Sequence, residues 1–226
     1  NILLSSLNLL KPASGEAETI PTQDIVLGCH YLTRIPEEYR SDVPKKIFAT
    51  VNEVKLAYDN GYIEINTPIQ FNGLTTTYGR VIFNEALPED HDFVNETLTK
   101  KLLGNIIGNL INRYDNERIR VVLDEIKEIG FKFADASSGL SVGIFDLTVS
   151  DKKKDILAEG EKKVDLINEQ FQDGLLTESE RKARIIEVWT IAKNEVWKIV
   201  PESLGKESPI SITIESGARG SWSQAQ

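Results

Sequence analysis

The sequence predicts an α+β fold, with a small irregular and β-rich N-terminal part, a helical middle and a long antiparallel helical hairpin near the C-terminus. Two turn signals, Asn60-Gly61 and Asn72-Gly73, frame short alternating segments in the first part. From Asp92 the apolar residues recur with a helical period, and residues 151–200 carry two heptad-like stripes. We therefore expect an α+β part over 1–90 and a helical part over 91–226.

The N-terminal part is expected to alternate short elements with loops. Pro12, Gly15 and Pro21 interrupt residues 1–35, which predicts loops, a turn and one short helix or strand. Residues 36–44 form a polar linker bounded by prolines. In "IFATVNEVKLAYDNG" the apolar residues have helical spacing, which predicts a helix that ends near Gly61.

Two strands are predicted next. Residues 63–67 alternate apolar and polar side chains, as a half-buried strand does. The stretch "TTTYGRVIFN" is interpreted as a further strand, because it is rich in β-branched and aromatic residues.

Two helices are predicted between Asp92 and Gly130. An apolar stripe from Val94 to Tyr114 defines the first, and a PEDHD stretch before it is interpreted as the helix start. Gly104 and Gly108 lie four residues apart on an adjacent face, which favours close packing against another helix in the core. Gly130 is interpreted as the residue that ends the second helix. The buried face of that second helix is predicted to comprise Ile119, Val122, Leu123 and Ile126.

The hairpin over 151–200 has the clearest pattern in the chain. After Gly174, Thr177 and Glu180 have the spacing of a capping box at the start of the second helix. The two helices should fold back on each other, with Phe171 and Trp189 in the shared seam. The charged flanks are interpreted as solvated faces. The apolar stripes comprise Leu157, Val164, Ile167 and Phe171 in the first helix, and Ile185, Trp189, Ala192, Val196 and Ile199 in the second.

Composition limits the possible functions. The 226 residues carry a net charge of -9, which argues against free-standing binding to nucleic acids or anionic membranes. Cys29 is the single cysteine, so an intrachain disulfide is impossible. No apolar run approaches the about 18 to 20 residues of a membrane helix. The chain contains no methionine and opens inside an apolar segment, which we interpret as a piece of a longer protein.

The sequence offers no self-contained catalytic centre. It contains no phosphate-binding P-loop, dinucleotide fingerprint, nucleophile elbow or CxxC pair. His91 lies among carboxylates in "PEDHD", but metal sites usually draw their ligands from several segments, so the helix start is the preferred interpretation. No catalytic residue and no metal ligand is assigned.

Arg219 is the candidate binding residue that the local pattern suggests. It projects from "ESGARGSWSQ", between Gly217 and Gly220, where little side-chain bulk surrounds it. Such a cation can meet a phosphate or a carboxylate. The same stretch is also typical of an ordinary polar loop, which the local pattern taken alone favours.

Five stretches in order resemble the β′ subunit of bacterial multisubunit RNA polymerases. They are "LLSSLNLLKPASGEAETIPTQDIVLGCHYLT", "TTTYGRVIFNEALPE", "IGFKFADASSGLSVGIFDL", "INEQFQDGLLTESERKARIIEVWTIAKNEV" and "ESGARGSWSQ". Each stretch is short, but their order and coverage make the combination specific. The sequence departs from the family pattern at Phe145, where an aspartate is usual, and at Lys182, where a tyrosine is usual.

The resemblance implies that the chain is the pore and funnel region of a DNA-directed RNA polymerase. This region lines the secondary channel, through which nucleoside triphosphates enter. Arg219, Gln23 and Asp24 would then be channel residues. The hairpin, including Phe171, Thr177, Glu180 and Trp189, would correspond to the rim helices that dock Gre-type cleavage factors.

The resemblance also implies partners. These are the β, α and ω subunits, Gre-type factors and nucleoside triphosphates, with DNA and RNA bound only through the complete cytoplasmic enzyme, and with no membrane. The family's magnesium-binding aspartate motif would precede residue 1, so Mg²⁺ belongs to the complete polymerase and the isolated chain is expected to be inactive. The alternatives from other classes are a stand-alone coiled-coil interaction protein and a stand-alone phosphate-binding enzyme that uses Arg219.

Overall fold

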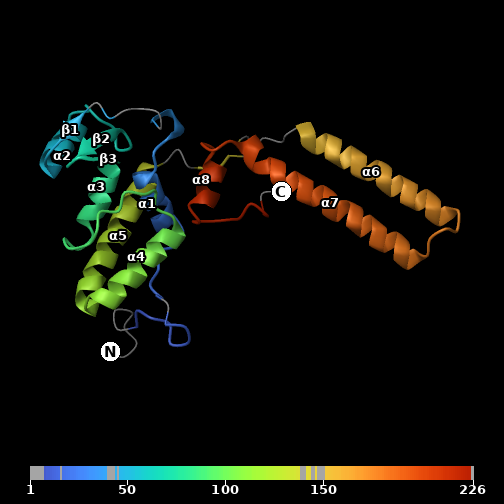
Figure 1. The fold of residues 1–226 in the computed structure, drawn as a ribbon, viewed down its shortest axis with the longest axis horizontal. Coiled ribbons are helices and arrows are strands. Elements are labelled where there is room, and N and C mark those ends of the chain that lie inside the picture. Colours follow the sequence, from blue (N-terminus) through green and yellow to red (C-terminus); the bar gives the residue numbers. More distant parts are fainter. Residues whose placement is uncertain are drawn as a thin grey trace. The chain divides into compact units, whose positions relative to one another are not determined.

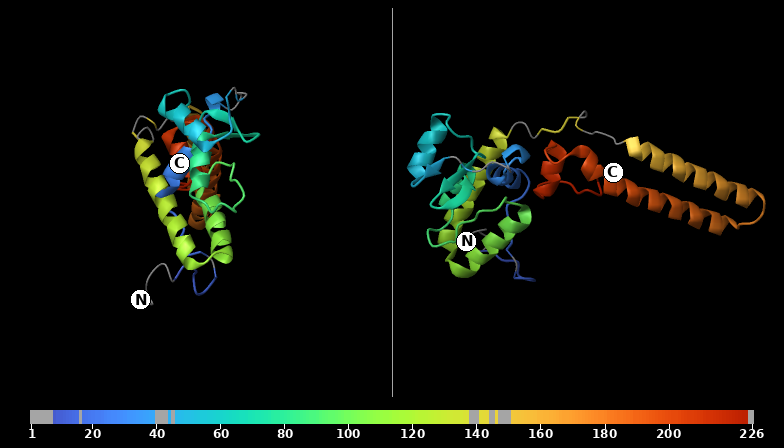
Figure 2. Two further views of the ribbon diagram at one scale, coloured as in Figure 1. Left: turned by 90° about the vertical axis from the view of Figure 1, so that its left-hand side faces the viewer. Right: turned by 45° about the horizontal axis from the view of Figure 1, so that its top comes forward.

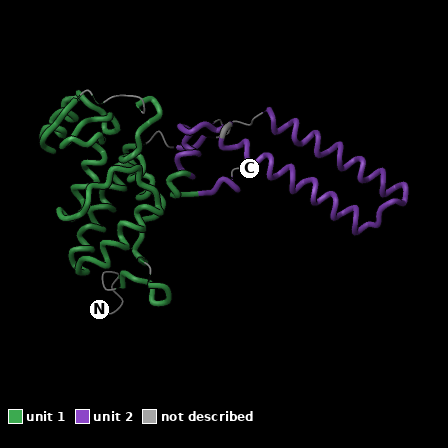
Figure 3. Tube along the Cα trace, viewed as in Figure 1, with its two compact units in different colours: residues 1–140, 215–219 green, residues 141–214, 220–226 purple. Residues whose placement is uncertain are grey.

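A computed structural model describes residues 8–15, 17–39, 44, 46–137, 141–143, 146 and 151–224. The chain divides into two compact units, which are coloured separately in Figure 3. Unit 1 comprises residues 1–140 and 215–219, and unit 2 comprises residues 141–214 and 220–226. The family regions expected over 1–90 and 91–226 are a different division, which stays a prediction. Phe145 lies outside the described residues.

Unit 1 combines a small sheet with helices, and unit 2 is helical, so the α+β prediction is confirmed (Figure 1). The helices of unit 1 are α1 (Asp24–Thr33), η2 (Glu37–Tyr39), α2 (Val51–Asp59), α3 (Tyr78–Glu85), α4 (Lys100–Arg113) and α5 (Asn116–Ala136). Its strands are β1 (Ile47–Phe48), β2 (Pro68–Phe71) and β3 (Leu74–Thr77). The largest fully buried side chains include Phe83, Leu32, Ile69, Leu98, Leu103, Ile107, Leu110, Ile119 and Ile126.

The sheet has the strand order β1-β2-β3, with β1 parallel and β3 antiparallel to β2. Asn72 and Gly73 join β2 to β3 with positive φ angles of 49° and 80°, as a two-residue hairpin turn requires. The turn predicted there is confirmed. The helix predicted before Gly61 is also confirmed, as α2.

The strand predicted over residues 63–67 is wrong. Ile63 and Ile65 are buried as the alternation suggested, but the backbone turns instead of extending. The cause is Asn66, whose buried amide donates to the carbonyl oxygens of Tyr31 at 2.9 Å and Arg34 at 2.7 Å. It thereby satisfies carbonyl groups at the C-terminal end of α1, which would otherwise lack partners.

The strand predicted over "TTTYGRVIFN" is correct only as far as Thr77. Its hydroxyl accepts a hydrogen bond from the Arg80 backbone N–H at 3.3 Å and so begins α3. Threonine is a favourable residue in both roles, since it suits a strand by its β-branch and a helix start by its hydroxyl.

Helices α1 and α5 pack closely together, as Figure 1 shows. At the crossing, a β-carbon added to Gly28 would overlap the carbonyl oxygen of Gly130 and lie 2.7 Å from the Ala134 nitrogen. A β-carbon on Gly130 would lie 2.9 Å from the Ile25 α-carbon. The prediction that Gly130 ends a helix is therefore wrong, because α5 continues through it and uses it for close backbone approach.

Residues 92–99 form an irregular segment outside any helix or strand, which we call the strap. The helix predicted from Asp92 begins only at Lys100, with Thr99 as its N-cap. The strap is held from both ends by side chains of the preceding helices. Leu98 accepts a hydrogen bond at 2.8 Å from His30 Nδ1 through its carbonyl and donates to Thr33 Oγ1 at 2.9 Å. Asn84 exchanges two hydrogen bonds with the Val94 backbone.

Unit 2 contains the predicted hairpin. Helices α6 (Asp151–Gln172) and α7 (Glu178–Leu204) lie side by side in the views of Figures 1 and 2, and α8 (Pro209–Glu215) follows. The seam between α6 and α7 buries Gly160, Ile167, Ala192 and Val196. Leu157 is 38% exposed, so its predicted place in the seam is wrong, and Ile156 is the more buried of the two.

The two aromatic residues predicted in the seam lie at its margin. The ring of Trp189 lies over Gly160, where a β-carbon would come within 3.1 Å of it. Trp189 nevertheless remains 37% exposed and Phe171 36% exposed. Each ring is therefore partly packed and partly available to another molecule.

Candidate functional site

The segment 215–219 is fixed to the start of α4. The Lys100 backbone N–H donates to the Ser216 carbonyl oxygen at 2.9 Å, and Ser216 is fully buried. Gly217 has a φ of 74°, and a β-carbon there would lie 3.1 Å from Lys100 Cβ. Positive φ and close approach both favour glycine at this position, as the sequence predicted.

This anchoring brings Arg219 to the N-terminal end of α1. Its Nη2 donates to Gln23 Oε1 at 3.4 Å and lies 3.9 Å from Asp24 Oδ1. The three residues assigned to one channel thus lie together, although 196 positions separate Gln23 from Arg219. Asp24 occupies the first turn of α1, where a carboxylate interacts favourably with the helix dipole.

The Arg219 contacts are long, and its side chain remains 64% exposed. An exposed pair of this kind contributes little stability, on the order of 0 to 1 kcal/mol. The guanidinium group is therefore oriented by its neighbours but not neutralised by a tight ion pair. Such a group can exchange its present contacts for those of an anionic ligand at small cost.

An open hollow of about 940 Å³ lies beside the anchored segment. Lys100 and Lys101 are among the residues that line it and contribute cations, and Gly104 and Gly108 line it too. A β-carbon on Gly108 would meet nothing within 4 Å, so the close helix packing predicted for this glycine face is wrong. The other lining residues are Ala17, Ile20, Thr99, Asn105, Asn109, Asn112, Glu215, Ser216 and Gly217.

The carboxylates around His91 are structural. Asp90 accepts a hydrogen bond from Arg113 at 3.0 Å and lies 3.6 Å from Arg118. These two contacts connect the end of α4 to the start of α5. The neighbouring Tyr114 hydroxyl group, together with these two cations, lowers the pKa of Asp90. In the part of the chain that the structure describes, no group of three or more potential ligands could hold a metal ion. The helix start predicted at this stretch is wrong, because residues 88–92 form a turn well before α4.

Cys29 and His30 lie on α1 and face the interior. Burial raises the pKa of the Cys29 thiol to about 12, so this cysteine is an unreactive core residue. His30 is 7% exposed and holds the strap in place by its hydrogen bond to the Leu98 carbonyl oxygen. Neither side chain is available for chemistry at the surface.

We expect the chain to lose stability as the pH falls below about 6.5 because His30 is buried. Burial is the main cause that lowers its pKa from 6.5, and the charge of Arg34 acts in the same direction, against the hydrogen bond to Leu98. The unfolded chain therefore binds a proton at higher pH than the folded chain. The stability that neutral His30 contributes is complete above the pKa of His30 in the unfolded chain. It is lost as the pH falls towards the lower pKa of His30 in the folded chain.

Urea unfolding at about pH 7.5 and about pH 5.5 measures this effect. The variant His91→Asn is the control, since it removes the only other histidine. It should show the same fall in the free energy of unfolding as the unmodified chain. Equal stabilities of the unmodified chain at both pH values would contradict the buried, neutral state of His30.

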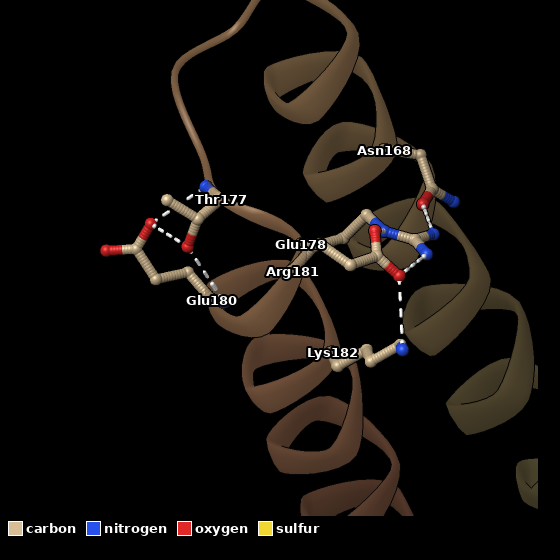
Figure 4. Close-up of polar contacts among 6 residues, drawn as sticks. All are labelled: Asn168, Thr177, Glu178, Glu180, Arg181 and Lys182. Carbon is tan, nitrogen blue, oxygen red and sulfur yellow. Dashed lines mark hydrogen bonds and ion pairs between the residues drawn. The ribbon is translucent and has the colours of Figure 1, made fainter.

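The tip of the hairpin is held by a compact set of polar contacts (Figure 4). Thr177 and Glu180 form the predicted capping box, with each side chain bonded to the backbone N–H of the other. Arg181 donates to both carboxylate oxygens of Glu178, at 3.2 and 2.9 Å, and to Asn168 of α6 at 3.2 Å. Its guanidinium group also lies 4.9 Å from the centre of the Phe171 ring.

Sequence reasoning missed the role of Arg181 in joining the two helices. Its place in the first turn of α7, beside the turn that contains Gly174, was the available signal. Leu175 at this tip is 72% exposed, which leaves an apolar side chain beside the fixed polar groups.

Residues 8–147 match the family model of RNA polymerase Rpb1, domain 3. The match covers more than half of the chain, which therefore belongs to this family. The resemblance to bacterial β′ subunits is likewise confirmed by individual relatives, each described as DNA-directed RNA polymerase subunit beta'. Over 228 to 240 aligned residues the identity is 38% with the proteins of Sulfurihydrogenibium sp. (strain YO3AOP1) and Desulforudis audaxviator, and 37% with that of Thermotoga petrophila.

These alignments include 99 to 100% of this chain but only 14 to 20% of each relative. The chain thus spans about a fifth or less of the length of the relatives that it matches. None of the helices in its described ranges is long and apolar enough to cross a membrane.

Proposed function

We propose that this chain is the portion of a DNA-directed RNA polymerase β′ subunit that lines the entry route of nucleoside triphosphates. The observation that supports this role is the convergence of Arg219, Gln23 and Asp24 at one exposed place in a chain that belongs to the family. The polymerase as a whole synthesises RNA from these triphosphates on a DNA template. Its other subunits, β, α and ω, are the proposed permanent partners.

Arg219 supplies the recognition of phosphate in this proposal. A guanidinium group presents several donors in a planar fork that suits phosphate oxygens. Lys100 and Lys101 add positive charge on the wall of the adjoining hollow. In a confined channel such charges raise the local concentration of an anionic substrate and its rate of entry. Weak, exchangeable contacts also let the substrate move on to the active centre.

We propose that the catalytic magnesium site of the polymerase lies outside this chain. A divalent ion held by carboxylates needs several acidic groups that converge, and no such group occurs within the described residues. No step of nucleotide addition is therefore assigned to this chain. We propose that it guides the substrate and leaves the chemistry to other parts of the enzyme.

We propose a docking role for the hairpin. Its tip combines the exposed Leu175 and the partly exposed Phe171 with charged groups that are already fixed by mutual contacts. Trp189 adds a further partly exposed ring along the seam. Apolar anchors surrounded by ordered polar groups are typical of protein-binding surfaces. A Gre-type cleavage factor is the proposed occupant.

Replacement of Arg219 by alanine in the assembled polymerase tests the substrate role. We expect the KM for nucleoside triphosphates to rise about two- to fivefold at low ionic strength, which corresponds to the loss of one exposed charged contact. The maximal rate should fall less. The effect on KM should shrink as salt is added, because counterions screen the same attraction.

Arg120→Ala is the matched control, since it removes the same charge from an exposed position on α5. It should leave the KM unchanged at every salt concentration. If Arg219 only holds its loop, Arg219→Ala will instead reduce stability or assembly while the KM stays flat. That result would remove the substrate role from Arg219.

A further inference from the structure

Gln23 has a backbone conformation that is unusual for its residue type. Its φ and ψ angles are 50° and -119°, and within the described residues only Asn72 shares a positive φ without being glycine. Asn72 lies in the turn between β2 and β3, where asparagine is a favoured residue. Glutamine has no such preference, so its conformation at position 23 requires another explanation.

Helix capping does not explain it. Gln23 is the N-cap of α1, but its side chain makes no capping hydrogen bond. The backbone carbonyl accepts from the Leu27 N–H at 3.0 Å, and any residue can provide that contact. Glycine would adopt the same conformation without strain and is an acceptable N-cap. The specific contribution of glutamine must therefore come from its side chain.

The Gln23 side chain meets Arg219. Its Oε1 accepts from Arg219 Nη2 at 3.4 Å, a shorter contact than the 3.9 Å between Arg219 and Asp24. A neutral acceptor orients a guanidinium group without cancelling its charge. The backbone near Arg219 is already held through Ser216 and Gly217, so its long side chain is the remaining mobile part.

We propose that Gln23 is a positioning residue for Arg219, and that its strained backbone conformation serves to direct the amide oxygen at the guanidinium group. This inference rests on the proposed role of Arg219 towards triphosphates. It adds that the orientation of Arg219 is set by the start of α1 and not by its own loop alone. Strained residues of this kind persist where the surrounding structure holds them for a function.

Gln23→Gly in the assembled polymerase tests the proposal, because it relieves the backbone strain and removes the side chain together. We expect the thermal stability to be maintained or raised, while the KM for triphosphates rises about two- to threefold, within the range of an exposed polar contact. A purely structural role would not raise the KM of a more stable protein. In the Arg219→Ala background, Gln23→Gly should cause no further change.

Asn72→Gly is the matched control. It relieves a positive φ in the β2–β3 turn and should leave the KM unchanged. If Arg219→Ala raises the KM and Gln23→Gly does not, the positioning role is overturned while the proposed function stands. Additive effects of the two variants would also overturn it. If Arg219→Ala itself leaves the KM flat, the proposed function fails first.

Discussion

Alanine at position 28 is expected to destabilise the chain by about 3 kcal/mol or more, or to prevent folding. The added β-carbon would overlap the Gly130 carbonyl oxygen and lie 2.7 Å from the Ala134 nitrogen. These are backbone atoms of α5, so no rotamer change can relieve the overlap. The two helices would have to separate and expose the apolar side chains between them. Urea unfolding followed by circular dichroism measures the loss.

Gly108→Ala provides the opposite expectation in the same chain. This glycine is also inside a helix, but a β-carbon there would meet nothing within 4 Å. The substitution should stabilise α4 by up to about 1 kcal/mol, since alanine is the better helix former. If Gly28→Ala and Gly108→Ala had the same effect, close contact between α1 and α5 would not be the reason for glycine at position 28.

Two other glycines, Gly174 and Gly130, show why the sequence predicted one turn correctly and one helix end wrongly. Gly174 and Thr177 predicted the turn of the hairpin because a turn and a capping box are encoded within a few residues. Gly130 was interpreted as a helix end because its partner, Gly28, lies about a hundred positions away. A single sequence does not display that pairing. The choice between a glycine that ends a helix and one that admits a neighbour depends on tertiary contacts.

The same distinction applies to the strand predicted over 63–67. Burial of Ile63 and Ile65 followed from the alternation, but the backbone conformation depends on Asn66 and its acceptors at the end of α1. The candidate site, too, was only partly predictable from local sequence. Glycine at position 217 indicated a loop that presents Arg219, but only the fold places Gln23 beside it, with a backbone angle that no local pattern signals.

Arg80 is the second residue for which a large effect is expected. Its side chain is 7% exposed and donates to the Thr33 carbonyl at 3.0 Å and to the Asn95 carbonyl at 2.7 Å. Further hydrogen bonds reach the side chains of Asn95 and Thr97 in the strap. Burial lowers the pKa of Arg80, while the charge of Glu96 acts in the opposite direction. The cost of burying this charge is offset by hydrogen bonds to neutral groups.

We expect Arg80→Leu to destabilise the chain by about 3 to 5 kcal/mol, since it removes several charge-assisted hydrogen bonds and leaves buried carbonyl groups without donors. Arg80→Lys should recover only part of this loss, because one ammonium group cannot reach acceptors on both α1 and the strap. Arg120→Leu, at an exposed position on α5, should change the free energy of unfolding by less than about 0.5 kcal/mol.

The pattern of these three variants separates a specific network from simple packing. If Arg80 acts mainly through its apolar stem, leucine will retain most of the stability and lysine will offer no advantage over it. If Arg80 acts through the hydrogen bonds of its guanidinium group, Arg80→Leu will be the least stable of the three variants. Amide hydrogen exchange will then rise first in the strap, because the Leu98 and Val94 amides are held in the same region of the fold. A stable Arg80→Leu variant with a protected strap would contradict the view that the strap is fixed by buried hydrogen bonds.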